Sequence, residues 1–177
     1  MNILALDLST KRSGWAVKCG QNEIEYGVIA SSAADVEKRI GIMRDGIIDL
    51  INRYNIDIII AEEVRPENGE STRRNAHTEK VLLWLQGIIA IAAYEQNSKI
   101  KYELIGASSW RSKLGIQGYR VKREEQKKID IDFANKKYNL KLTTSQDDEA
   151  DALGILTSYI EKGNEKSAGA FKEESAF

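Results

Sequence analysis

The stretch Ile3-Leu4-Ala5-Leu6-Asp7-Leu8-Ser9 near the N-terminus decides the fold. Residues 2–8 form a short apolar run, which is typical of a strand buried in a sheet. Asp7 closes this run, and a carboxylate at the edge of a buried strand is costly unless it has a function. A turn follows, and residues 14–19 and 23–29 then predict two more strands, so the chain should begin with an antiparallel meander.

The rest of the chain alternates helices with short strands. Apolar residues at helical spacing predict a helix over 33–54, and the isoleucine-rich run 57–61 predicts a buried parallel strand. A polar loop over 65–76, an apolar helix over 78–96 and a fifth strand over 101–105 follow. Helices are predicted over 108–114, 121–138 and 145–161, with Ser145 as the N-cap of the last one. This order predicts an α/β fold with a mixed five-stranded sheet and helices on both faces.

The length and composition indicate one domain. The chain has 177 residues, of which 42% are hydrophobic and 30% charged, and this is enough to bury a single core. We predict a domain over residues 1–162 and a disordered tail over residues 163–177, which are mostly small and polar. No signal peptide is visible and no apolar run reaches the length of a membrane span, so the predicted location is the cytoplasm.

Counts of particular residue types exclude several kinds of site. Cys19 is the only cysteine and His77 the only histidine, which rules out an intrachain disulfide, a cysteine-based zinc site and a multi-histidine metal site. We interpret His77 as a residue at the start of a helix rather than as a catalytic group. A bound metal would need mainly carboxylate ligands, and these favour hard cations such as Mg²⁺ or Mn²⁺.

Four acidic residues lie at the apolar edges of elements that are far apart in the sequence. Asp7 and Glu62 close two buried strands, whereas Asp148 and Asp151 open the last helix and share one of its faces. If the two strands are adjacent and parallel, the four carboxylates converge and repel one another. Two Mg²⁺ ions about 4 Å apart would remove this repulsion, as in many nucleases. The joint pattern therefore predicts a catalytic metal site.

The spacing leaves two alternatives open. Glu63 is as good a carboxylate as Glu62, although strand alternation lets only one of them point toward Asp7. Asp147 shares a helix face with Asp151 as well as Asp148 does. Each acid taken alone also has a structural explanation, because an Asp near a helix start commonly serves as a cap.

Three motifs of the chain resemble those of RuvC-type Holliday-junction resolvases, and in particular those of phages. Residues 3–9 followed by Gly14-Trp15-Ala16-Val17 resemble the opening of these proteins, and Ile60-Ala61-Glu62-Glu63-Val64 resembles their second motif. Asp148-Glu149-Ala150-Asp151-Ala152-Leu153 is similar to their last motif. The order and spacing agree over most of residues 1–160.

This resemblance implies a ribonuclease-H-like fold and a metal-dependent DNA endonuclease. It implies a homodimer that binds branched DNA, namely a four-way junction, and makes two symmetrical nicks. It also implies that the metal ligands are Asp7, Glu62, Asp148 and Asp151.

Basic residues are concentrated in two regions that we predict to contact DNA. The formal net charge is only −1, so any basic face must be local. The resemblance places Arg111 and Lys122 near the scissile phosphate, where a cation stabilises transition-state charge. A solvated helix is the other explanation, because acids are interleaved with the bases. The predicted DNA-binding residues are Arg73, Arg74, Arg111, Lys113, Lys122 and Arg123.

Three other functions compete with this prediction. An actin-like phosphotransferase also uses an acid on its first strand, but it needs two such domains and glycine-rich phosphate loops, which are absent from this sequence. A related single-domain nuclease could act on RNA or on another branched nucleic acid. A non-catalytic junction-binding protein is disfavoured, because uncompensated carboxylates would oppose DNA binding.

Overall fold

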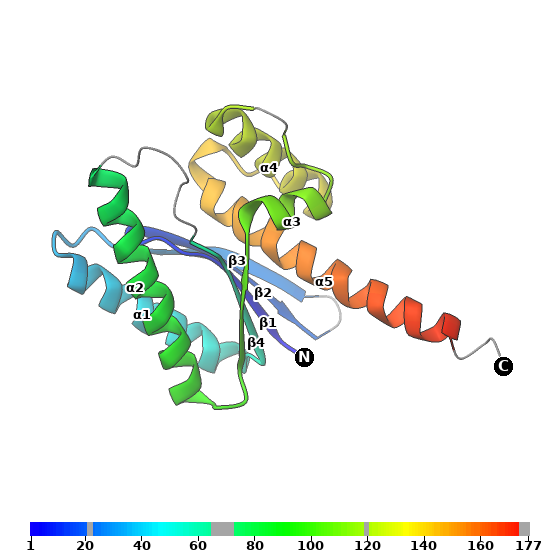
Figure 1. Cartoon of the computed structure of the whole chain (residues 1–177), viewed down its shortest axis with the longest axis horizontal. Helices are drawn as coiled ribbons and strands as arrows, with labels where there is room; N and C mark the ends of the chain where they lie inside the picture. Colours follow the sequence, from blue (N-terminus) through cyan, green and yellow to red (C-terminus); the bar gives the residue numbers. More distant parts are fainter. Residues whose placement is uncertain (21–22, 65–72, 119–120, 174–177) are drawn as a thin grey trace.

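The computed structural model describes the backbone of residues 1–20, 23–64, 73–118 and 121–173, and the side chains of all of these except 23, 73–75 and 162–173. Its elements follow the predicted order of strands and helices (Figure 1). They are β1 (Ile3–Asp7), β2 (Arg12–Cys19), β3 (Glu23–Ala30), α1 (Val36–Tyr54), β4 (Ile58–Glu62), α2 (Arg73–Gln96), β5 (Lys101–Ile105), α3 (Ala107–Lys113), α4 (Arg123–Tyr138), the 3₁₀ turn η1 (Thr144–Gln146) and α5 (Asp147–Glu173).

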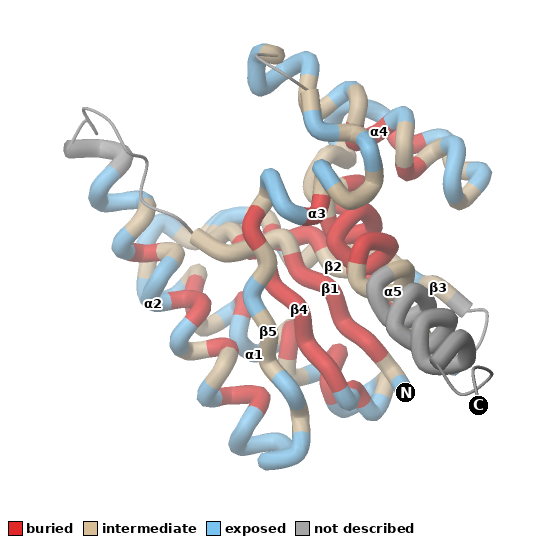
Figure 2. Tube along the Cα trace, turned by 45° about the vertical axis from the view of Figure 1, so that its right-hand side comes forward, coloured by how far each residue is buried: buried red, intermediate tan, exposed pale blue. Residues whose placement is uncertain are grey.

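The five strands form one mixed sheet in the order β3-β2-β1-β4-β5. The meander β1-β2-β3 is antiparallel, whereas β4 pairs in parallel with both β1 and β5. The two central strands, β1 and β4, are buried along nearly their whole length (Figure 2). The predicted fold class is therefore confirmed, including the parallel contact between the two strands that end in acids.

Helices cover both faces of the sheet, and each face has its own apolar cluster. Helices α1 and α2 lie on one side, while α3, α4 and α5 lie on the other (Figure 1). Side chains alternate along a strand, so Leu4 and Leu6 of β1 pack toward α1 and α2, whereas Ile3 and Ala5 pack toward α5. By the same alternation Asp7 belongs to the face that α5 covers.

Strand register shows which of Glu62 and Glu63 lies on the same face of the sheet as Asp7. In β4, Ile58 and Ile60 belong to the cluster beneath α5, and Ile59 and Ala61 to the other. Alternation therefore brings Glu62 to the face of Asp7. The last paired residues of β1 and β4 are Leu6 and Ala61, so Asp7 and Glu62 come one position later on adjacent parallel strands.

The structure differs from the sequence prediction at three helix ends. Helix α2 begins at Arg73, within the predicted polar loop 65–76. Residues 73–77 lack the apolar periodicity of the later helix, but they contain no glycine or proline that would prevent helix formation. Residues 65–72 lie outside the described part. Ser145 lies inside η1, where the tight turn moves the cap to Thr143, whose backbone N–H donates to the Gln146 side chain at 3.3 Å.

The third difference concerns the C-terminus. Helix α5 continues to Glu173, whereas the tail from residue 163 was predicted to be disordered. The side chains from residue 162 onward are outside the description, so the separation of a tail from the domain stays a prediction. Within the described part of the chain, no helix combines the length and apolar character needed to cross a bilayer.

Candidate active site

A cleft of about 1060 Å³ opens where β1 and β4 end and α5 begins. All four acids that were predicted to converge line it, although they come from three elements far apart in the sequence. Parallel pairing explains Asp7 and Glu62, because the carboxyl ends of parallel strands meet at the same sheet edge. The acidic residues around the cleft are Asp7, Glu62, Glu63, Glu79, Asp130, Asp147, Asp148 and Asp151.

Gly14 allows the first turn of α5 to approach the sheet. This residue pairs with Asp7 across β1 and β2. A Cβ atom at Gly14 would lie only 1.9 Å from the backbone oxygen of Asp148, which no side chain can tolerate. The absence of a side chain at this position therefore brings the acids of α5 next to the acid of β1.

Trp110 of α3 holds the acid of β4. Its ring is fully buried, and its Nε1–H donates to Oε2 of Glu62 at 2.8 Å. Helix α5 leaves room for the ring at Gly154, where a Cβ atom would lie 2.5 Å from the indole. A buried tryptophan N–H needs a partner, and here the partner is a carboxylate that lines the cleft.

Arg111 connects the acids of two helices. Its guanidinium donates through Nε to Asp130 at 2.9 Å and through an Nη atom to Asp151 at 3.3 Å. The guanidinium carbon also lies 4.2 Å from the centre of the Trp110 ring. The side chain is only 15% exposed, so both ion pairs are largely shielded from water.

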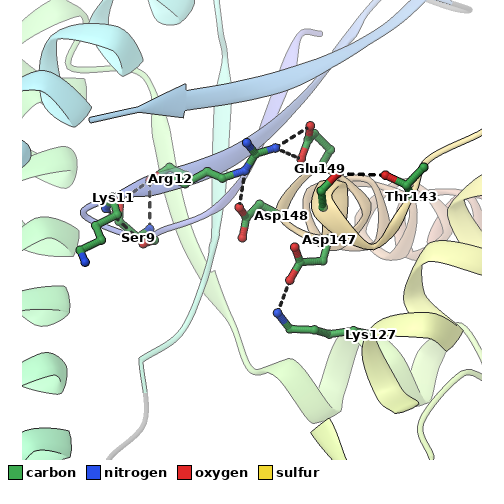
Figure 3. Close-up of polar contacts among 10 residues, drawn as sticks. Ser9, Lys11, Arg12, Lys127, Thr143, Asp147, Asp148 and Glu149 are labelled. Atoms are coloured by element: carbon green, nitrogen blue, oxygen red, sulfur yellow. Dashed lines mark hydrogen bonds and ion pairs between the residues drawn. The ribbon is translucent and has the colours of Figure 1, made fainter. Parts of the chain in front are cut away.

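A second arginine binds the first turn of α5 from the side of β2. Figure 3 shows Arg12 between Asp148 and Glu149, with Nε 2.7 Å from Asp148 and an Nη atom 2.9 and 3.0 Å from the two oxygens of Glu149. Lys127 of α4 forms an ion pair with Asp147 on the opposite side of this turn. Three consecutive acids are thus each paired with a cation.

Burial and like charge raise the pKa values of the acids in the cleft. Burial, followed by the charges of Glu62 and Asp148, raises the pKa of Asp7 to about 8. Burial and the charge of Asp7 also raise the pKa of Asp151, although Arg111 opposes this shift. Burial and the neighbouring Asp147 raise the pKa of Asp148, and Arg12 opposes the shift. Without a further cation, the cleft favours protonated carboxyl groups.

The chemistry of these side chains fits a hard divalent cation, which would be held by carboxylate oxygens. Oδ1 of Asp151 is buried and has no hydrogen-bond partner, so one oxygen of this acid is available to a ligand. Among the described residues, however, no group of three or more His, Cys, Asp or Glu side chains is arranged to hold an ion as it stands. Arg12 and Arg111 occupy oxygens of Asp148 and Asp151, and the remaining charges repel one another. The role of the acids as metal ligands stays a prediction.

The predicted DNA-binding residues do not all lie at this cleft. Arg111 and Arg123 line it, although Arg111 is engaged with two acids. Lys122 is exposed at the N-cap of α4. Lys113 lies elsewhere, because its Nζ donates to the carbonyl of Ser158 at 2.5 Å and it lines a separate pocket beside β5. Arg73 and Arg74 begin α2, and their side chains are not described.

Several residues of the site were not predicted from the sequence. Lys11 and Arg12 belong to the turn and strand after Asp7, where no apolar pattern distinguishes them. Asp130 is almost fully buried, but its sequence neighbours do not show this, because Asp132 also lies between two apolar residues of the helix and is exposed. The ion pair of Lys127 is a tertiary contact that helical spacing does not reveal.

Comparison with known proteins identifies one matching family and several relatives. The family model described as Lactococcus phage M3 protein matches residues 1–162. The chain is 26% identical over 167 residues to the crossover junction endodeoxyribonuclease RuvC of Dictyoglomus thermophilum, covering 92% of this chain and 98% of the relative. It is 28% identical over 168 residues to the protein of the same name from Dictyoglomus turgidum, with the same shares covered.

Solved structures of RuvC from Thermus thermophilus share the fold. One gives a TM-score of 0.66 at 17% identity and covers 92% of this chain and 97% of that chain. A second structure, of the same protein in complex with a Holliday junction substrate, gives a TM-score of 0.64 at the same identity and coverage. The resemblance to RuvC-type resolvases inferred from three motifs is thereby confirmed, together with the fold that it implied.

The raised pKa of Asp7 predicts how the stability of the metal-free protein depends on pH. The pKa is about 8 in the folded protein and near 3.8 in the unfolded chain, so the folded state binds the extra proton between these values. The free energy of unfolding should therefore fall as the pH rises from about 4 to about 8. In Asp7→Asn this fall should be smaller. At pH 8 the free energy of unfolding of the variant should exceed that of the wild type by more than about 1 kcal/mol.

Urea unfolding in EDTA at several pH values between 5 and 8.5 measures this difference. Asp132→Asn is the matched control, because Asp132 is exposed on α4, and it should keep the slope of the wild type. An Asp7→Asn profile that runs parallel to that of the wild type would show that Asp7 is not the group responsible.

Proposed function

The chain belongs to the family described as Lactococcus phage M3 protein, and we propose that it is a metal-dependent endonuclease that resolves four-way DNA junctions. One observation carries this proposal: acids from β1, β4 and α5 line one cleft, and a buried carboxylate oxygen in it has no partner. Two relatives that align over nearly their whole length are named crossover junction endodeoxyribonucleases. The family match covers the same residues 1–162 that we take as the nuclease domain.

We assign the metal-binding and catalytic role to the four acids predicted from the sequence. Asp7, Glu62, Asp148 and Asp151 would hold two divalent cations, either Mg²⁺ or Mn²⁺. Such a pair of ions supplies an activated water and stabilises the leaving oxygen in phosphodiester hydrolysis. Trp110 would keep the Glu62 carboxylate oriented, and Gly14 would keep Asp148 close to Asp7.

Cleavage of a defined set of substrates tests the proposal. The wild type with Mn²⁺ should make paired symmetrical nicks in a labelled four-way junction and cut a linear duplex far less. Asp7→Asn should lower the nicking rate by at least about a thousandfold while junction binding persists, because the cations that Asp7 would hold act on the charge that develops in the transition state. The exposed Asp132→Asn variant should retain full activity.

The other substrates decide between this function and its alternative. Preferred cleavage of an RNA–DNA hybrid or a single-stranded RNA would favour a related nuclease that acts on RNA. Unimpaired nicking by Asp7→Asn would remove Asp7 from the mechanism.

Two cations on different walls of the cleft are suited to contact DNA phosphates. Lys11 extends from the turn between β1 and β2, and Arg123 from the first turn of α4. Neither side chain forms a hydrogen bond or an ion pair within the described part of the chain, whereas Lys127 and Arg111 are paired with acids. A DNA strand placed across the acids would meet one cation on each wall. This local positive charge would favour phosphate binding although the net charge of the chain is −1.

Salt dependence measures these contacts directly. Each of Lys11→Gln and Arg123→Gln should reduce the slope of log affinity against log salt by about 1, because one phosphate contact is lost. Junction binding measured in EDTA over a range of NaCl concentrations provides the slope. Lys99→Gln is the control, since Lys99 is exposed before β5, at the other end of the sheet, and should leave the slope unchanged. A slope unaffected by both cleft substitutions would contradict this binding mode.

An exposed apolar face on α2 supports a homodimer, which two symmetrical nicks require. Trp84, Ile91 and Tyr94 are 47%, 62% and 67% exposed and recur at spacings of seven and three residues, so they lie on one side of the helix. Gly87 lies between them in sequence, and its Cβ position faces open space, which would let another helix approach closely. We infer that a second copy of the chain packs against this face.

Substitution of this face should give monomers. Ile91→Glu places a charge in the apolar face and should lower the apparent mass measured by light scattering after size exclusion to that of one chain. Its junction products should be single nicks rather than paired cuts. Leu104→Glu on the edge strand β5, where Leu104 is 47% exposed, should leave the mass unchanged. An unchanged mass for Ile91→Glu would place the dimer contact elsewhere.

A further inference from the structure

Asp130 is a buried acid that the proposed chemistry does not use. It lies on α4 with 1% of its surface exposed, and both of its oxygens accept hydrogen bonds. Oδ2 accepts from Nε of Arg111 at 2.9 Å, and Oδ1 accepts from Nε2 of Gln126 at 2.9 Å. An ionised acid at this depth is tolerated only when it is paired and hydrogen-bonded, and Asp130 meets both conditions.

Gln126 fixes Asp130 to the segment that precedes α4. The same Nε2 donates to the carbonyl of Ile116 at 2.9 Å, while Oε1 accepts from the backbone N–H of Gly118 at 2.9 Å. The Gln126 amide therefore makes three hydrogen bonds and has a single orientation. Asp130 in turn presents one defined oxygen to Arg111.

Arg111 is shared unequally between two acids. Its contact with Asp130 is 2.9 Å and that with Asp151 is 3.3 Å, and the two contacts use different nitrogen atoms. The stacking of the guanidinium on Trp110 keeps it at this position. The other oxygen of Asp151, Oδ1, is buried and has no hydrogen-bond partner.

We propose that Asp130 is a positioning residue that draws Arg111 away from Asp151 and so keeps Asp151 available to a divalent cation. The proposal rests on the proposed function, because it takes Asp151 as a metal ligand. Without the charge of Asp130, Arg111 would pair with Asp151 alone, and the net negative charge around the site would fall by one. Both effects oppose the binding of a divalent cation.

Titration calorimetry with Mn²⁺ alone, in the absence of DNA, tests this role. Asp130→Asn preserves the shape of the side chain but removes its charge, and it should weaken Mn²⁺ binding about 5- to 10-fold. The double variant Asp130→Asn with Arg111→Gln removes both charges and retains a hydrogen-bonding pair. It should restore the affinity to within about twofold of the wild type. Asp132→Asn, two residues along α4 and exposed, is the control and should bind as the wild type does.

The outcomes separate this inference from the proposed function. A folded Asp130→Asn variant with wild-type affinity for Mn²⁺, or a double variant that stays as weak as the single one, overturns the inference. If the wild type binds no Mn²⁺, the proposed function fails as well. Circular dichroism checks folding, because loss of a buried ion pair can unfold a protein. Should Asp130→Asn not fold, Arg111→Gln decides: tighter Mn²⁺ binding supports the inference, and unchanged or weaker binding overturns it.

Discussion

Repulsion between desolvated carboxylates at the C-terminal edge of β1 and β4 is the constraint on which the rest of this structure depends. Burial raises the pKa values of Asp7, Asp148 and Asp151, and the charges of neighbouring acids raise them further. A fold that gathers such groups loses stability unless opposite charge compensates them. The surroundings of the cleft are organised accordingly, with a cation or an N–H donor beside most of the acids.

This compensation is divided between the two sides of the first turn of α5. Arg12 approaches it from the sheet, whereas Arg111 and Lys127 approach it from α3 and α4. Helices α3 and α4 therefore do more than cover the apolar face of the sheet. They also bring positive charge to an acidic edge, because Arg111 and Lys127 each form an ion pair with an acid at the start of α5.

The fold could be predicted well from the sequence because each of its strands carries a local signal. Alternation along β1 and β4, together with their parallel pairing, was sufficient to bring Asp7 and Glu62 together. The partners of the acids could not be predicted in the same way. Arg12 and Glu149 are 137 positions apart, and no periodicity connects them. Lys113 follows Arg111 by two residues, which is about half a helical turn, so its side chain contacts Ser158 instead of lining the cleft.

Two glycines allow close contacts of α5 that limit how narrow the cleft can become. At Gly14 the strand backbone abuts the backbone of α5, and at Gly154 the helix abuts the indole of Trp110. Neither contact can be shortened by rotating a side chain, since the atoms that touch belong to main chain or to a fully packed ring. They prevent α5 from moving closer to β2 or to Trp110, whereas the ion pairs of Arg12 and Arg111 restrain its movement in the other direction. The width of the cleft at this edge therefore has a lower limit that the backbone at Gly14 sets, so the acids of β1 and α5 cannot come closer together.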